Sequence, residues 1–222
     1  MAPNVSINLT ERFAMILVYD TETTGLPTRA AWGHPSQPYL VQVAAQLIDL
    51  TGTVLDSMNR IVKPRGYTIP DRAVEAHGIT TEMALEQGIE VEPVIEEFDA
   101  LVAKCTHLVG HNEEFDWKLF QIARARLPEG HPGKACTMNT KVRKCTQRLA
   151  SNIMKMPATE KMLKAGFHKP KPPKLIEAHE YFFGEGFEGA HDAMNDVKAC
   201  AKVYLALIEH YERSGKTATS SS

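Results

Sequence analysis

The chain of 222 residues contains no long hydrophobic run and only four cysteines. No stretch approaches the roughly 18 consecutive apolar residues that a membrane-spanning helix needs, so we expect no membrane partner. The start of the chain lacks a basic segment followed by an apolar run and a cleavage site, so we expect no secretory signal. The cysteines show neither CxxC spacing nor a disulfide framework, which favours reduced thiols and a cytoplasmic protein.

Positive charge is concentrated in one segment of the chain. The formal net charge is only -2, but residues 134–174 contain 11 Lys or Arg and a single acidic residue. Residues 1–133 contain 10 basic and 18 acidic residues, and residues 175–222 contain 4 and 8. This segregation favours a polyanionic partner for the basic segment, with a merely solvated helical lobe as the alternative.

The spacing of apolar residues predicts one mixed α/β domain over residues 12–212, between an N-terminal arm (1–11) and a disordered tail (213–222). Apolar runs predict strands at 12–20, 40–49, 53–62 and 106–111, the second and third joined as a hairpin by Thr51-Gly52. Helical spacing predicts helices at 91–104, 113–127, 174–183 and 192–212, short helical pieces within 71–85, and a mostly helical basic segment.

Four carboxylates occupy positions where a buried side chain is expected. Asp20 and Glu22 end the first strand and, being two residues apart on an extended chain, project to the same side. Asp116 and Asp196 each lie on or beside the apolar stripe of a helix. Isolated buried carboxylates are costly to desolvate, so four that converge are most simply neutralised by divalent cations.

Oxygen ligands without thiolate or paired imidazole neighbours favour Mg²⁺ or Mn²⁺. Two such ions roughly 3.5–4 Å apart can hold a phosphodiester, activate a water and stabilise the leaving alkoxide. That reaction also needs a general base near neutral pH, and His191 is the candidate. It directly precedes the last helix, for which Asp192 is the expected N-terminal cap.

Three motifs of this chain resemble those of the DEDDh 3′→5′ exonucleases, the family of the DnaQ-like proofreading epsilon subunits of bacterial DNA polymerase III. They are DTETTG at 20–25, GHNEEFD at 110–116 and HDAMND at 191–196. An AHGIT segment at 76–80 adds to the likeness, which extends over about residues 13–208. The resemblance implies a ribonuclease H-like fold with a mixed five-stranded sheet flanked by helices.

The resemblance also implies roles for individual residues. Asp20, Glu22 and Asp196 are expected to ligate two ions, with Asp20 bridging them, and Asp116 to help hold the second ion. His191 is expected to deprotonate the attacking water. The positions that match the pocket for the terminal nucleotide are Thr23, Leu26, His77 and Phe115.

The expected activity is metal-dependent release of nucleoside 5′-monophosphates from DNA 3′ ends, single-stranded or frayed, in proofreading or repair. The basic segment is expected to contact the phosphate backbone through Lys141, Arg143 and Lys144. An RNA 3′→5′ exonuclease stays an alternative, because the shared motifs do not select the sugar. A non-catalytic module that docks on a DNA polymerase is a second alternative, disfavoured because all the expected ligands are present. A free-standing enzyme would suit a bacterium or a phage equally.

Overall fold

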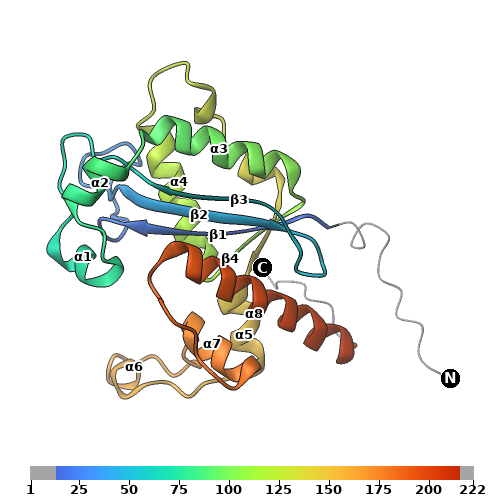
Figure 1. Ribbon diagram of the computed structural model, residues 1–222. Helices are drawn as coiled ribbons and strands as arrows, with labels where there is room; N and C mark the ends of the chain where they lie inside the picture. Colours follow the sequence, from blue (N-terminus) through green and yellow to red (C-terminus); the bar gives the residue numbers. More distant parts are fainter. Residues whose placement is uncertain (1–13, 216–222) are drawn as a thin grey trace.

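A mixed five-stranded sheet forms the centre of the computed structural model, which describes residues 14–215 (Figure 1). The strand order is β3-β2-β1-β4-β5. Their bounds are β1 Ile16–Thr23, β2 Leu40–Ile48, β3 Val54–Ile61, β4 His107–Gly110 and β5 Val142–Cys145. The expected arm at 1–11 and most of the expected tail lie outside the described residues.

Strands β1, β2 and β3 pair antiparallel, which confirms the predicted hairpin, whereas β4 pairs parallel with β1 and β5 parallel with β4. The fifth strand is the one that the apolar pattern does not place. Its four residues, Val-Arg-Lys-Cys, lie inside the basic segment predicted to be mostly helical, and that prediction is wrong there. The strand forms because its backbone completes the edge of the sheet beside β4, not because its side chains alternate.

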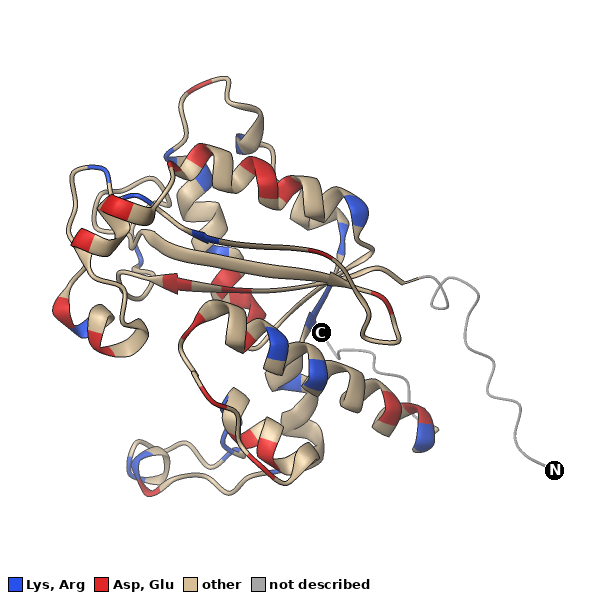
Figure 2. Ribbon diagram, in the orientation of Figure 1, with Lys and Arg blue, Asp and Glu red and all other residues tan. Residues whose placement is uncertain are grey.

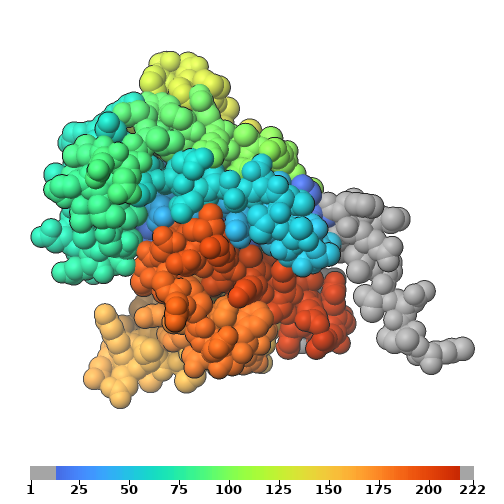
Figure 3. All heavy atoms as spheres, in the orientation of Figure 1, coloured from blue at the N-terminus to red at the C-terminus, as the bar shows by residue number. Residues whose placement is uncertain are grey.

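The helices form two layers, one on each face of the sheet. Their bounds are α1 Asp71–His77, α2 Thr81–Gln87, α3 Val91–Lys104, α4 Glu113–Ala125, α5 Thr146–Met154, α6 Glu160–Lys164, α7 Leu175–Phe183 and α8 Ala193–Arg213. Figure 1 shows α3 and α4 over one face and α5, α7 and α8 over the other, with α1 and α2 at the end toward which β1 points. Two short 3-10 helices, Pro132–Lys134 and Thr137–Thr140, precede β5. Figures 1 and 3 show the part of the chain around α6 projecting from the body.

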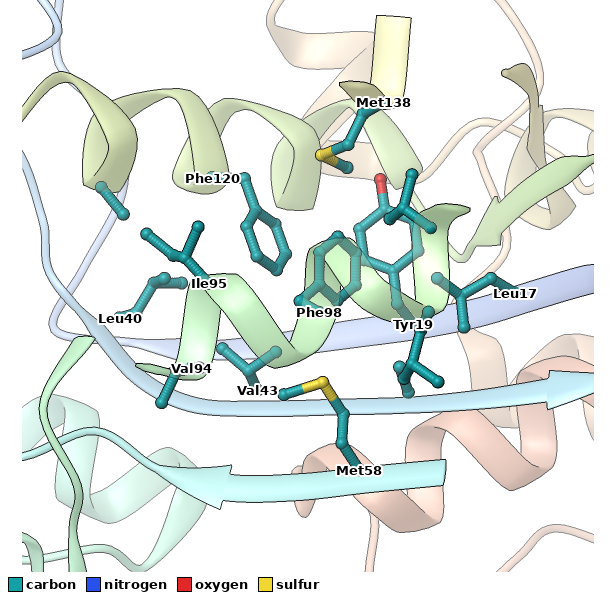
Figure 4. Packing of buried hydrophobic residues seen from close by; sticks show 14 of the residues in the cluster. Leu17, Tyr19, Leu40, Val43, Met58, Val94, Ile95, Phe98, Phe120 and Met138 are labelled. Carbon is teal, nitrogen blue, oxygen red and sulfur yellow. The ribbon is translucent and has the colours of Figure 1, made fainter. Parts of the chain in front are cut away.

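Each face of the sheet has its own hydrophobic core, because successive strand side chains point to opposite faces. Leu17 and Tyr19 of β1 join the core beneath α3 and α4, where Phe98 and Phe120 stack with ring centroids 4.1 Å apart (Figure 4). Ile16 and Val18 join the core beneath α8. Full burial of such side chains stabilises the fold by about 1.5–3 kcal/mol each. The alternation therefore fixes which helix each later residue of β1 will face.

The described residues contain no helix that is both long enough and apolar enough to cross a membrane. All four cysteines are free, in agreement with the expected absence of a disulfide framework.

Gly110, at the end of β4, permits a close approach of α4 to β1. A Cβ atom there would lie 3.2 Å from the Glu113 backbone and 3.3 Å from the Tyr19 carbonyl oxygen.

Candidate active site

Asp20 and Glu22 lie within β1 rather than beyond it, since the strand continues to Thr23. Both project to the face that α8 covers, in phase with Ile16 and Val18. The intervening Thr21 projects to the face of α4, in phase with Tyr19. One strand therefore presents two carboxylates to one helical layer and a hydroxyl to the other.

Asp116 approaches the same strand from the face of α4. It lies in the first turn of that helix and is 2% exposed. Its Oδ1 accepts hydrogen bonds from the Thr21 backbone N–H (3.0 Å) and from the Thr21 hydroxyl (2.7 Å). These two bonds hold the Asp116 carboxylate at the end of β1, as predicted from its place on the apolar stripe.

Asp196 and His191 come from the beginning of α8. Asp192 caps this helix by accepting a hydrogen bond from the Asn195 backbone N–H, as the sequence predicts. His191 has a positive φ of 70°, and its backbone N–H donates to Asp196 Oδ2 at 3.1 Å. The imidazole is exposed while Asp196 is half-buried, so the histidine lies at the mouth of the site.

Gln42 fixes the start of α8 beside β1. It is 4% exposed, and its cross-strand partner in β2–β1 pairing is Glu22. Its Oε1 accepts a hydrogen bond from the Ala193 backbone N–H (3.2 Å), and its Nε2 lies 3.4 Å from Asp192 Oδ2. The first turn of α8, and with it Asp196, is thereby held over Glu22.

These elements bring the predicted catalytic side chains close to one another: Asp20 interacts with Asp116, Asp196 and Glu22. Figure 2 shows acidic positions on β1, the strand at the centre of this site. Ligand atoms of Glu22, His191 and Asp196 all lie within 4.8 Å of one another. Burial and the neighbouring carboxylates of Asp116, Asp196 and Glu22 raise the pKa of Asp20 well above its ordinary value. The four carboxylates therefore repel one another at close range.

The other three carboxylates are perturbed in the same direction. Burial, followed by repulsion from Asp196 and Asp116, raises the pKa of Glu22 to about 8. Burial also raises the pKa of Asp116 to about 7, against the opposing hydrogen bonds from Thr21. Burial raises the pKa of Asp196 as well, while the His191 backbone N–H lowers it. In all four carboxylates the main cause of the raised pKa is burial, and repulsion from other cluster members adds to it for Asp20 and Glu22.

The donor set fits divalent cations. No Lys or Arg within residues 14–215 forms an ion pair with any of the four carboxylates. The carboxylate oxygens are hard ligands of the kind that Mg²⁺ and Mn²⁺ prefer. Cations bound among them would offset both the desolvation and the repulsion that raise the pKa values of Asp20 and Glu22.

The residues expected to surround a terminal nucleotide lie near this cluster to different degrees. His77, at the end of α1, interacts with the Thr23 backbone and with His191: burial lowers its pKa, Thr23 raises it and His191 lowers it again. Leu26 is 76% exposed, as suits a side chain that meets a ligand. Phe115 is partly buried against the core beneath α4, which favours a packing role for much of its ring.

The three basic residues expected to contact nucleic acid have intramolecular partners. Lys141 Nζ donates to the Cys105 carbonyl oxygen at 2.8 Å. Arg143 forms two 2.7 Å hydrogen bonds to the carboxylate of Glu113, which is 4% exposed. Lys144 is half-buried. Arg143 therefore neutralises a buried carboxylate, a structural role that charge counting alone does not reveal.

Sequence reasoning missed three supporting side chains. Gln42 interrupts an otherwise apolar strand, and a polar residue at such a position indicates a buried side chain that needs hydrogen-bond partners. Thr21 lies between Asp20 and Glu22 but projects to the opposite face of the sheet. No feature of the sequence indicates that its hydroxyl binds Asp116. Glu113 accepts a 2.6 Å hydrogen bond from Tyr19 Oη as well as the bonds from Arg143. Its partners lie 94 and 30 residues away, so no local motif predicts this network.

A family model for exonucleases, RNase_T, matches residues 17–204 of the chain. Among curated proteins, the PolC-type DNA polymerase III of Thermotoga petrophila is 25% identical over 214 residues, which are 96% of this chain and 13% of that protein. The PolC-type enzyme of Thermotoga maritima is 30% identical over 119 residues, 54% of this chain and 8% of that protein. The chain thus spans only a small part of the polymerases that it matches.

Solved structures show the same fold. E. coli Exonuclease I in complex with a dT13 oligonucleotide aligns with a TM-score of 0.68 at 20% identity, covering 91% of this chain and 42% of that one. The moderately thermophilic Exonuclease I from Methylocaldum szegediense aligns with a TM-score of 0.64 at 22% identity, covering 88% and 40%. The sheet and its two helical layers are therefore the ribonuclease H-like exonuclease fold that the motifs imply.

Proposed function

Because the chain belongs to the RNase_T exonuclease family, we propose that residues 12–212 form a metal-dependent 3′→5′ exonuclease acting on DNA. The membership of the chain in this family confirms the family resemblance that the three motifs indicate. The proposed reaction removes nucleoside 5′-monophosphates one at a time from single-stranded or frayed 3′ ends. The oligonucleotide bound to E. coli Exonuclease I supports DNA as the substrate class.

The observation that carries this proposal is the convergence of four carboxylates around the end of β1. Asp20, Glu22, Asp116 and Asp196 would hold two divalent cations, Mg²⁺ or Mn²⁺. Cations bound there supply Lewis-acid stabilisation of the phosphate and of the leaving oxygen. The raised pKa values of these carboxylates show that their charged forms are costly in this site, a cost that bound cations would offset.

His191 is proposed as the general base. Its imidazole lies at the exposed edge of the carboxylate cluster, with a ligand atom within 4.8 Å of those of Glu22 and Asp196. An imidazole nitrogen there accepts the proton of a water that attacks the phosphorus. The backbone hydrogen bond from His191 to Asp196 fixes this geometry without using the ring.

The terminal nucleotide would lie beyond the end of β1. Thr23 marks the last residue of the strand, and its hydroxyl is held by a 2.7 Å hydrogen bond to the Gly25 carbonyl oxygen. The exposed Leu26 offers an apolar surface to a base, and His77 borders the same space near His191. Phe115 would close the pocket from α4. The similarity to PolC-type polymerases supports a role in proofreading or repair, in association with a DNA polymerase.

The test is incubation of the protein with 5′-labelled single-stranded DNA and matched RNA, with Mg²⁺, Mn²⁺ or a chelator. The expected result is a ladder that shortens from the 3′ end of DNA, in Mg²⁺ or Mn²⁺ only. On DNA labelled throughout its length, the released product should co-migrate with nucleoside 5′-monophosphates. Shortening of RNA alone would overturn the substrate assignment, and activity in chelator would overturn the metal requirement.

A further inference from the structure

A pocket that the proposed chemistry does not use is lined by Trp117, the residue after Asp116 on α4. It opens between α4 and α5, at the carboxyl ends of the parallel strands β4 and β5. In α/β sheets this is the edge where ligands usually bind. Its lining residues are Glu113, Glu114, Trp117, Arg143, Lys144, Cys145, Arg148, Leu149 and Asn152.

The pocket combines an apolar wall with an excess of positive charge. Trp117 and Leu149 contribute apolar surface, and the Arg143 guanidinium lies 4.5 Å from the centroid of the Trp117 ring. The two acidic lining residues are both compensated, Glu113 by Arg143 and Glu114 by Lys118 at 2.7 Å.

Two further cations line the pocket: Lys144, which has a partner within the protein, and Arg148. Arg148 is exposed and forms no hydrogen bond or close ion pair within the described residues, although its charge is near enough to Glu114 to help lower the pKa of that carboxyl. The amide of Asn152, one turn along α5, adds a donor and an acceptor at the rim. An aromatic wall with cations at its edge suits a nucleotide: a sugar or base against the wall and a phosphate at the cations.

The position of this pocket along a bound strand follows from helix geometry. Successive residues of an α-helix are about 100° apart, so Phe115 and Trp117 flank Asp116 on opposite sides of α4. Trp117 faces β5, as its contacts with Arg143 and Asn139 show. Phe115 lies on the other side, where Arg126, the residue directly after α4, donates to backbone carbonyl oxygens just before β2.

Since the scissile phosphate must lie at the carboxylates, the terminal nucleotide and the rest of the strand lie on opposite sides of Asp116. We propose that the pocket between α4 and α5 binds the sugar-phosphate backbone of the nucleotides upstream of the scissile bond, with Arg148 as a phosphate ligand. This inference rests on the proposed exonuclease function, because that function places the terminal nucleotide on the side of Phe115.

The test compares two substrates with Arg148→Gln. One is a short single-stranded oligothymidylate, and the other is the p-nitrophenyl ester of thymidine 5′-monophosphate, which has no nucleotide upstream of the scissile bond. The matched control is Lys202→Gln on the exposed side of α8, which also removes one positive charge. Circular dichroism and thermal unfolding establish that both variants are folded.

We expect Arg148→Gln to lower kcat/KM on the oligothymidylate about tenfold and to leave the ester unchanged. The slope of log kcat/KM against log salt concentration should fall by about 0.7, the value for one phosphate contact on a single strand. Lys202→Gln should behave as the wild type on both substrates. An unchanged kcat/KM on the oligothymidylate, an equal loss on both substrates, or an equal loss in the control would each overturn the proposal. Failure of the wild type to hydrolyse either substrate would instead refute the proposed function.

Discussion

Replacing Glu22 with glutamine should make the metal-free protein more stable at pH 8. Glu22 has a pKa of about 8 in the folded protein, against an ordinary value of 4.5. A carboxyl whose pKa is raised by folding contributes its stability below pH 4.5, and that contribution is lost as pH rises through about 8. The wild-type protein without metal should therefore lose stability between about pH 5 and pH 8.

The magnitude follows from the two pKa values. The difference between about 8 and 4.5 is equivalent to at most about 5 kcal/mol at pH 8. Glu22 keeps part of its surface in water, and the clustered carboxylates share their protonation, so the gain on substitution will be smaller. We expect Glu22→Gln to raise the free energy of unfolding by about 1–3 kcal/mol at pH 8 and by less than about 1 kcal/mol at pH 5.

The assay is urea unfolding followed by circular dichroism at pH 5 and pH 8, in a chelator and again with Mg²⁺. Glu86→Gln, on the exposed surface of α2, is the matched control and should change little at either pH. Added Mg²⁺ should stabilise the wild type at pH 8 more than it stabilises Glu22→Gln, because the glutamine removes one ligand. If Glu22→Gln were destabilised at pH 8 in the chelator, the electrostatic account of the cluster would be refuted.

Three further predictions concern single residues. Asp20→Ala or Asp196→Ala should lower turnover at least about 10³-fold in a folded protein, measured on labelled DNA; near-normal rates would remove that residue from the site. His191→Ala should lower kcat about 10²–10⁴-fold with little change in calorimetric Mn²⁺ affinity, and a parallel loss of both would indicate a ligand rather than a base. Arg143→Gln should lower the free energy of unfolding by about 2–4 kcal/mol in urea, because it leaves the buried Glu113 without its cation. A change below about 0.5 kcal/mol there would mean that Glu113 does not need its partner.

Much of the fold could be predicted because each long element has a strong periodic pattern. Helix α3 was predicted with its observed bounds, and β2 and α8 within a residue or so. Strand β5 could not be placed, since its stability comes from backbone pairing with β4 and its side chains carry no apolar alternation. An edge strand of this kind forms because a neighbouring strand is available for backbone pairing, and its own residues do not predict it.

The carboxylates could be predicted because a charged residue in an apolar pattern is conspicuous. The side chains that hold the surrounding elements in place could not be predicted. Charge counting predicts Arg143 as part of a nucleic-acid surface because it ignores partners, and the partner of Arg143 is Glu113, buried in the first turn of α4. Gln42 joins β2 to the start of α8 across 150 residues, a contact that only the folded chain creates.

The central claim is that side chains from β1, α4 and α8 hold two cations in one site. Crystals soaked in Mn²⁺ test this directly through anomalous scattering. Two anomalous peaks roughly 3.5–4 Å apart, each bonded to carboxylate oxygens of Asp20, Glu22, Asp116 or Asp196, are the predicted result. Full occupancy elsewhere on the protein with no peak at these carboxylates would contradict the account.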